Sequence, residues 1–524
     1  MSLIPLPYRP DIWRTGAFPA PWPQTSDAIY ETLAALQARG ANYAVVALPD
    51  EGDAVRDRGM SFVAGAADNL FLDPDMDRAV DLASATLDCL RRPTAEKIAD
   101  FYALVMQHPV TSTLDDVLPR VAAANPARDR VLPFFTWLAT SAPDREPVKF
   151  AIAMLGLCKE PNSLDLIRTL GGHEEFTKCA AVAMGSILGE KLAWRDWWAL
   201  AKSVRGWGRI DLVERIAPLG DANFRRWLVR DGFQNSIMNE YLAHIAAVDG
   251  DLLGQLRAPD ALSDRPRLRG ASQIFIALVS GGPTQDMYDY DDGAEAALIW
   301  LDLAAQRPTC EQRGLAAHKL TRFAARDDCP WPAKQREAVQ TKAAAYLARA
   351  DLKAVVETAL MDGTPKECWS ATQIAQAVGL DAWPYLMARQ EKDPTARCWY
   401  DLMQTRDRTR VAMVVDLAER QLDLDAITTG AASEMGVGPK FQVHMSLDFV
   451  VQDLRHHPGL GWTLIEAALQ SPVVRNRNMA AQALAAWPKG AWPDGAVPAL
   501  RAAIRIEPEE TTRQAMENAL TPDL

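Results

Sequence analysis

The densest cluster of potential ligand atoms in the sequence is an acidic segment that also carries two tyrosines. Within residues 286–295, the side chains that could contact a ligand are Asp286, Tyr288, Asp289, Tyr290, Asp291 and Asp292. Carboxylate oxygens suit Ca²⁺ or Mg²⁺, but the alternating ligand spacing and the final glutamate of an EF-hand loop are absent. We therefore expect a solvated loop without a metal. If the loop has a function, we expect it to dock a basic partner, with the tyrosines as anchors.

A second candidate site mixes arginine with tryptophan between residues 194 and 230. Its candidate binding residues are Arg205, Trp207, Arg225, Arg226 and Trp227. Guanidinium groups bind phosphates and aromatic rings stack on bases, so this composition could bind nucleic acid, as in helical-repeat DNA glycosylases. Carboxylates are interspersed, however, and the basic excess is small. We favour the alternative in which the tryptophans belong to the core and the arginines are solvated.

Histidine and cysteine form no recognisable metal-binding or catalytic pattern. His456 and His457 are adjacent, so on a helix they would point about 100° apart and could not easily share a metal. His173, followed by two glutamates, is typical of a helix start, where the helix dipole favours negative charge. The seven cysteines are dispersed without a CxxC pair, which is typical of reduced intracellular thiols. We assign no metal site and no catalytic residue.

Composition and charge exclude several classes of protein. The chain of 524 residues has a formal net charge of -12, which disfavours a general nucleic-acid binder. Its 48% hydrophobic and 24% charged residues are typical of a globular protein. The sequence contains no run of 18 apolar residues, so we expect no membrane span. The first residues lack the basic start and apolar core of a secretory signal, and we expect a cytoplasmic protein.

The spacing of apolar residues predicts helices through most of the chain. One exception is the segment 1–25, whose prolines predict an extended arm. In this arm, Trp13 and Trp22 either attach the segment to the body of the protein or are presented to a partner. The other exception is a strand-like interval, Tyr43 to Leu48 followed by Met60 to Ala64, where β-branched and apolar residues cluster.

Two parts of the chain show an internal repeat. A shift of 36 residues matches six pairs: Leu464 with Leu500, Ala467 with Ala503, Pro472 with Pro508, Arg477 with Arg513, Ala483 with Ala519, and Leu484 with Leu520. The matches fall at helical spacing and predict a repeated helix pair, with the proline in the first turn of the second helix. A weaker self-match at a shift of 29 residues places Lys149, Ala151 and Gly156 on Lys178, Ala180 and Gly185.

Helix pairs repeated at this period resemble HEAT-like repeats, whose stacked hairpins form an α-solenoid. The resemblance implies an all-α fold, an α-solenoid of stacked HEAT-like helix hairpins with an extended N-terminal arm. The predicted parts are the arm (1–25), an N-terminal helical region (26–140), helical repeats (141–280), the acidic loop (281–295), irregular helical repeats (296–440) and C-terminal HEAT-like repeats (441–524).

Three segments resemble uncharacterised bacterial proteins, some of which are labelled limonene hydroxylase. They are residues 194–209 (WRDWWALAKSVRGWGR), 224–243 (FRRWLVRDGFQNSIMNEYLA) and 471–479 (SPVVRNRNM). This resemblance implies a monooxygenase with a redox cofactor. A haem-thiolate enzyme needs a cysteine in a glycine-containing loop, and a flavin or nicotinamide enzyme usually carries GxGxxG between a strand and a helix. Neither pattern is present in the sequence, so we expect no cofactor.

The favoured function is that of a non-catalytic binding or scaffolding protein. Stacked helix hairpins create an extended face that suits a macromolecular partner, and a protein is the expected partner. Two alternatives remain: an enzyme of the limonene hydroxylase-labelled type, and a helical-repeat nucleic-acid-binding protein. A deep pocket with converging polar groups would favour an enzyme. A broad groove without perturbed ionisable groups would favour a binding protein.

Overall fold

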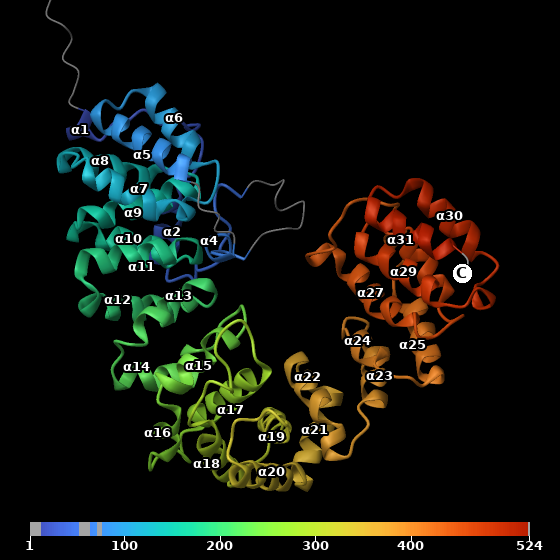
Figure 1. Ribbon diagram of the computed structural model, residues 1–524. Coiled ribbons are helices and arrows are strands. Elements are labelled where there is room, and N and C mark those ends of the chain that lie inside the picture. The colour runs from blue at the N-terminus through green and yellow to red at the C-terminus, as the bar shows by residue number, and fades with distance from the viewer. Residues whose placement is uncertain (1–11, 52–62, 71–75, 522–524) are drawn as a thin grey trace, which may run out of the picture. The chain divides into compact units, whose positions relative to one another are not determined.

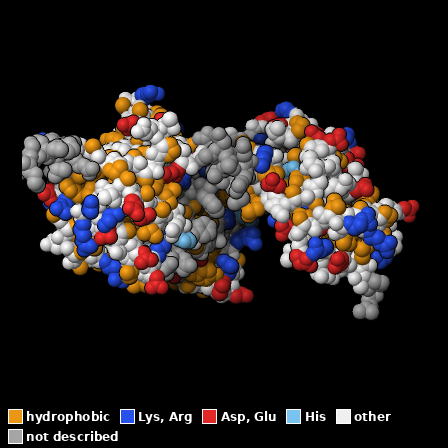
Figure 2. Space-filling model, turned by 90° about the horizontal axis from the view of Figure 1, so that it is seen from above, with side chains coloured by type: hydrophobic (Ala, Val, Ile, Leu, Met, Phe, Trp, Pro, Cys, Tyr) orange, Lys and Arg blue, Asp and Glu red, His pale blue; other side chains and the backbone are white. Residues whose placement is uncertain are grey.

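The structure is a computed structural model that describes residues 12–51, 63–70 and 76–521 (Figure 1). In these ranges the regular structure consists of helices, with a single isolated β-bridge between Glu434 and Val473. The prediction of an all-α fold is confirmed. No helix of the described ranges combines the length and apolar character needed to cross a membrane. On the face seen in Figure 2, acidic and basic side chains are interspersed with hydrophobic ones.

The prediction of a strand at Tyr43–Leu48 is wrong, because this segment is a loop that lies against a helix start. Its backbone oxygens are bound by groups at a helix start instead of by a neighbouring strand. The Ala44 oxygen accepts from the Glu174 amide at 2.9 Å, and the Val46 oxygen lies 3.0 Å from Nε2 of His173. Of the second predicted strand, residues 60–62 lie outside the described residues.

The chain divides into two compact units. The first unit contains the described residues up to Gln306 together with Lys319–Lys342, and the second contains Arg307–His318 and the described residues from Ala343 onward. Two helices span the division in the chain, α19 (Glu311–Ala324) and α20 (Ala333–Leu347).

The first unit is built from short and medium helices joined by short loops. They are α1 (Ile12–Thr15), α2 (Ile29–Ala38), α4 (Ala67–Leu70), α5 (Met76–Arg91), α6 (Ala95–Val105), α7 (Leu114–Ala123), α8 (Arg128–Ser141), α9 (Arg145–Cys158), α10 (Leu164–Gly171), α11 (Glu174–Leu188), α12 (Glu190–Ser203), α13 (Trp207–Ile216), α14 (Ala222–Trp227), α15 (Glu240–Val248), α16 (Leu252–Arg257), α17 (Arg265–Ser280) and α18 (Gly293–Ala305).

Helices of the first unit pack in two rows. In one row α7, α9, α11, α13, α15 and α17 contact one another in this order, and in the other α10 contacts α12. Contacts of α8 with α9, α10 with α11 and α12 with α13 join the rows (Figure 1). Helix α2 comes from earlier in the chain and contacts both α8 and α10. The unit is therefore held together mainly by neighbours in sequence, with α2 as an added element.

The weaker self-match corresponds to α9 and α11, which begin 29 residues apart at Arg145 and Glu174. Its two matched glycines each lie against a neighbouring helix, Gly156 of α9 against α11 and Gly185 of α11 against α12. A Cβ atom on Gly156 would lie 2.7 Å from Cα of Ala183, and one on Gly185 would lie 2.9 Å from the Trp197 ring. Both positions need glycine because the neighbouring helix approaches too closely for a side chain.

The described part of the predicted arm differs from an extended segment, because Ile12–Thr15 is a helical turn. The segment that follows packs on the first unit through aromatic rings. The Trp22 ring stacks on Trp137 with centroids 5.1 Å apart, and Phe18 meets Phe134 edge to face at 5.3 Å. Burial of these rings offsets the lack of backbone hydrogen bonding in a proline-rich segment. Residues 1–11 of the arm lie outside the described residues.

The second unit continues with shorter helices and ends in two helix pairs. Its helices are α21 (Ala350–Asp362), α22 (Pro365–Ile374), α23 (Trp383–Lys392), α24 (Trp399–Met403), α25 (Arg408–Gln421), α26 (Leu424–Ile427), α27 (Gln442–Leu454), α28 (Trp462–Leu469), α29 (Val474–Ala486), α30 (Ala496–Ile506) and α31 (Glu510–Leu520). Helix α28 pairs with α29 and α30 with α31, while α28 also contacts α30 and α29 contacts α31. The last two pairs therefore stack on each other.

The 36-residue shift superposes these two pairs, since α29 and α31 begin 36 positions apart in the chain. Leu464 and Leu500 are both fully buried. The matched prolines, however, lie outside the helices: Pro472 and Pro508 each precede the residue that caps the helix start. The prediction that this proline lies in the first turn of the second helix is therefore wrong, because it lies just before the helix start. At the observed position proline is equally tolerated, because no intrahelical N–H bond is required there.

Candidate functional site

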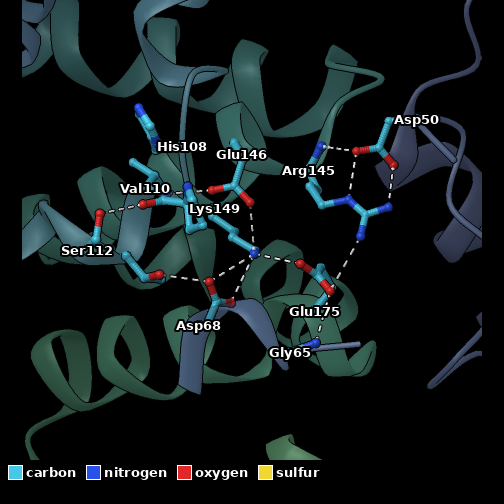
Figure 3. Close-up of polar contacts among 12 residues, drawn as sticks. Asp50, Gly65, Asp68, His108, Val110, Ser112, Arg145, Glu146, Lys149 and Glu175 are labelled. Carbon is cyan, nitrogen blue, oxygen red and sulfur yellow. Dashed lines mark hydrogen bonds and ion pairs between the residues drawn. The ribbon is translucent and has the colours of Figure 1, made fainter. Parts of the chain in front are cut away.

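The most densely charged site in the first unit is a buried cluster around Lys149 (Figure 3). The Lys149 ammonium, on the second turn of α9, is completely buried. Its Nζ atom lies 2.6 Å from Oε1 of Glu175, 3.0 Å from Oε1 of Glu146 and 2.9 Å from Oδ2 of Asp68. These three carboxylates come from α11, α9 and α4. A buried lysine needs such pairing because an isolated ammonium would lose its hydration without replacement.

A second cation, Arg145, extends the cluster toward the loop that precedes α4. Its guanidinium binds Asp50 through two parallel contacts, Nε to Oδ2 at 2.8 Å and Nη2 to Oδ1 at 3.0 Å. The same group contacts Glu51 at 3.0 Å and lies 3.6 Å from Oε2 of Glu175. The Asp50 carboxylate also accepts from the Arg145 amide, so it caps the start of α9. Arg145 thus ties this loop to α9.

Backbone amides complete the coordination of the carboxylates around Lys149. The Gly65 amide donates to Oε2 of Glu175 at 3.0 Å, and the Val110 amide donates to Oε2 of Glu146 at 2.6 Å. Both amides belong to segments outside the helices that carry the glutamates. The cluster therefore joins two loops to α9 and α11 by charge-assisted hydrogen bonds.

The neighbouring Glu174 anchors a third segment. Its carboxylate accepts hydrogen bonds from the amides of Arg205, Gly206 and Gly208 at the start of α13. His173 caps α11, with Nδ1 accepting from the Glu175 amide at 3.2 Å. The prediction that His173 marks a helix start is confirmed, and burial lowers the pKa of its imidazole.

The charges in the cluster perturb one another's protonation. Burial raises the pKa of Glu146 even though Lys149 opposes it. Burial acts in the same direction on Glu175, but Lys149 and Arg145 together outweigh it and hold the pKa of Glu175 below its usual value. Burial favours a neutral Lys149, yet its three carboxylates outweigh that effect and raise the pKa of the ammonium. The three carboxylates therefore favour the charged form of Lys149.

The cluster has no arrangement suited to catalysis. Cys179 next to the cluster is buried, and burial raises the pKa of its thiol, which disfavours the reactive thiolate. No group of three metal-ligating side chains occurs in the part of the chain that the structure describes. The cluster instead fixes α4 and the preceding loop on α9 and α11. No motif in the sequence predicts this cluster, although the 29-residue match of Lys149 with Lys178 also aligns Glu146 with Glu175.

A buried polar network in the second unit brings a serine and a histidine together. Nδ1 of His444 lies 3.0 Å from Oγ of Ser471, and the Ser471 hydroxyl donates to Oδ1 of Asn476 at 2.7 Å. Asn476 in turn donates to Asp448 at 2.7 Å, and burial raises the pKa of Asp448 to about 6. All four side chains are buried, so Ser471 has no access to a substrate. The network joins α27 to α29.

The five arginine and tryptophan residues predicted as a site lie in different environments. Trp207 is a core residue whose ring meets Tyr241 at 5.1 Å. Arg205 is exposed and its amide is bound by Glu174. Arg225 and Arg226 are exposed on α14, and Trp227 at the end of this helix is half-buried. The structure therefore brings three of them together on α14 and leaves Trp207 inside.

Helix α12 supplies aromatic residues that the prediction left out. The rings of Trp194 and Trp198 lie 6.2 Å apart and nearly parallel, and Trp198 contacts Trp227 of α14 at 6.0 Å. Cations cover both α12 rings: Arg195 lies 5.5 Å from the Trp194 centroid and Lys202 lies 4.7 Å from that of Trp198. We call this region the tryptophan surface. It consists of Trp194, Arg195, Trp198, Lys202, Arg225, Arg226 and Trp227.

The acidic segment is more ordered internally than a simple solvated loop. Tyr290 is only 3% exposed, so its ring belongs to the core and is not available as a surface anchor. Tyr288 is partly exposed and packs on Phe323 at 5.0 Å. The Tyr288 amide donates to Asp286, whose own amide donates to Asp289. Asp291 and Asp292 are exposed, and Asp292 precedes α18.

Comparisons with known proteins identify no relative of the chain. No family model, no curated protein and no solved structure matches the chain. Neither HEAT-like repeats nor the proteins labelled limonene hydroxylase are supported as relatives by these comparisons.

Proposed function

We propose that the chain is a non-catalytic helical-repeat protein of the cytoplasm, an α-solenoid of HEAT-like hairpins that binds a protein partner. The tryptophan surface is the observation that carries this proposal. The solenoid is supported by the order of contacts in the first unit and by the two stacked pairs α28–α29 and α30–α31. In such a fold each hairpin buries its apolar side against its neighbours, which leaves an extended surface for partners.

The composition of the tryptophan surface supports binding to a protein. Tryptophan and arginine are the residue types most enriched among the side chains that dominate the energy of protein interfaces. The rings of Trp194, Trp198 and Trp227 are each half-buried. A partner that covered their exposed parts would remove apolar area from water.

The charge of the surface indicates an acidic partner. Arg195 and Lys202 lie over the Trp194 and Trp198 rings, whereas Asp196 on α12 is neutralised by Arg168 at 3.0 Å. The surface is thus locally basic on a chain with a formal net charge of -12. Complementary charge would speed the association with an acidic partner and make it sensitive to salt.

A second candidate function uses the same surface. The nearly parallel rings of Trp194 and Trp198, each covered by a cation, would also suit the bases of a single nucleic-acid strand. The experiment must therefore separate the two partners.

The test compares proteins captured from cells that naturally express the chain. The bait is either the parent chain or a variant carrying Arg195→Glu and Lys202→Glu, two exposed positions over the rings where folding should tolerate the change. Trp369→Ala is the matched control, since Trp369 is 50% exposed on α22 of the other unit. We expect specific proteins to be lost with the double variant and retained with the control. Binding of a single-stranded oligonucleotide by the parent, lost in the double variant, would instead support the nucleic-acid function.

A further inference from the structure

A pocket on the first unit lies apart from the tryptophan surface. It has a volume of about 340 Å³ and is lined by residues of α7, α9, α11 and α13, four helices that contact one another in this order. Gly156 and Ala183 both line it at the point where α9 and α11 approach most closely. We call it the α7–α13 groove. Its volume lies within the range of small-molecule sites and is too small for a folded partner.

The walls of the groove are mainly apolar. Helix α7 contributes Leu114 and Leu118, α9 contributes Leu157, and α11 contributes Val182. All four remain accessible to solvent in part, and Val182 is 48% exposed. These side chains form an apolar wall that an elongated hydrocarbon body would cover favourably.

The α13 end of the groove carries an available cation, Arg215. This residue is half-buried; Asp211 and Glu214 of the same helix attract its charge, but its guanidinium forms no hydrogen bond or ion pair with a residue that the structure describes. Lys178, the other cation in the lining, is already held by the Asp68 carbonyl at 2.8 Å and by Asn69 at 2.9 Å. A guanidinium presents paired donors that match a carboxylate, so Arg215 is the group suited to a ligand anion.

Protein carboxylates near the groove limit where an anion can bind. One is Asp68, which accepts from the hydroxyl of the lining residue Thr111 at 2.7 Å and is paired with Lys149. Asp115 is exposed on α7, the helix farthest from α13 in the series. Asp211 and Glu214 lie on α13 itself, and the charge of Arg215 attracts both carboxylates. Asp211 also lies near Lys178 and Asn69, and Glu214 is exposed. A ligand anion would therefore bind Arg215 from the groove side, with its apolar body directed toward α7.

We propose that the α7–α13 groove binds a small amphipathic carboxylate, with its unbranched apolar body along Leu114, Leu118 and Val182 and its carboxylate on Arg215. This binding is independent of the proposed protein partner, because the two surfaces share no residue.

Calorimetric titration of the full chain with sodium octanoate tests this inference, with 1-octanol and octylammonium as ligands of equal chain length. We expect saturable binding of octanoate to one site and weaker binding of the other two. Arg215→Gln should weaken octanoate binding about tenfold or more, the usual effect of losing a charge-assisted hydrogen bond. Val182→Gln should also weaken it, whereas Arg225→Gln, an exposed arginine outside the groove, should leave it unchanged.

Several outcomes would overturn the inference. They are the absence of saturable octanoate binding at millimolar concentration, octanol or octylammonium binding as tightly as octanoate, and an unchanged affinity in Arg215→Gln. If Arg215→Gln fails to fold, as judged by thermal unfolding, Arg215→Lys replaces it. That variant keeps the charge but loses the paired donors, so an affinity equal to that of the parent would contradict the proposed carboxylate contact.

Discussion

Arg477 and Arg513 lie 36 positions apart in the chain and make the same local contact. Each donates from Nη1 to the backbone oxygen six residues earlier, Arg477 to Ser471 at 2.7 Å and Arg513 to Glu507 at 3.3 Å. Each contact joins a helix to the turn that precedes it. Glu507 also pairs with Arg477 of the previous hairpin, at 2.6 Å from Nε. Arg477 therefore stabilises both the turn before its own helix and the packing of this helix pair on the next one.

Replacement of Arg477 should be far more damaging than replacement of Arg513. Arg477 and Glu507 are both completely buried, so Arg477→Ala would leave an unpaired buried carboxylate and cost about 3–5 kcal/mol. Arg513 is partly exposed, and Arg513→Ala should cost about 1 kcal/mol or less. Urea unfolding of the two variants measures the difference. Addition of Glu507→Ala to Arg477→Ala should recover part of the loss; no recovery would contradict the unpaired-charge explanation.

The two matched leucines should also contribute unequally to stability, with Leu484 contributing more than Leu520. Leu484 is fully buried between two hairpins, and Leu484→Ala should lower the free energy of unfolding by about 2–5 kcal/mol through lost burial and the remaining cavity. Leu520 is only half-buried near the end of the last helix, so Leu520→Ala should cost less. Thermal unfolding compares the two variants. Equal stability of both variants and the parent would show that the 36-residue alignment does not identify core positions.

The two glutamates that bind Lys149 should contribute unequally to stability. Lys149 and Arg145 lower the pKa of Glu175, so its ionised form stabilises the fold at neutral pH, and Glu175→Gln should cost about 1–3 kcal/mol. The pKa of Glu146 is raised by burial, and Glu146→Gln should cost less. The stability due to Glu175 is present above its usual pKa and is lost as the pH falls through its lower folded value. Denaturant unfolding from pH 7 to pH 3 should therefore show the Glu175→Gln deficit shrinking in acid.

The contribution of Asp448 to stability should depend on pH in the opposite way to that of Glu175. Its folded pKa of about 6 lies above the usual value, so the folded state binds the proton of Asp448 more tightly than the unfolded state does. The free energy of unfolding therefore falls as the pH rises from about 4 to 6. At about 1.4 kcal/mol per pKa unit, the loss is at most about 3 kcal/mol. Asp448→Asn should remove this loss and be more stable than the parent at pH 7. Asp416→Asn, at an exposed position, is the control; if both variants follow the parent across this range, Asp448 is not the titrating group.

The sequence by itself determined the helical architecture, because helices follow from local residue spacing. Apolar residues at helical intervals predict helices wherever they occur, and the 36-residue matches from Leu464 to Leu520 predicted two helix pairs in the region where α28 contacts α29 and α30 contacts α31. The strand predicted at Tyr43–Leu48 failed for the complementary reason. The same β-branched and apolar residues suit a loop equally well when helix termini satisfy its backbone groups, and those termini lie more than 100 residues away in the chain.

Only the tertiary structure decided which charged and aromatic side chains meet. Lys149 binds carboxylates 3, 26 and 81 positions away, and only the first of these separations has a helical period that a sequence can reveal. Tyr290 is a second example. Its acidic neighbours in the sequence predict an exposed side chain, but the packing of its loop buries the ring. Burial and pairing across long separations depend on how helices stack, and local residue spacing carries no information about that arrangement.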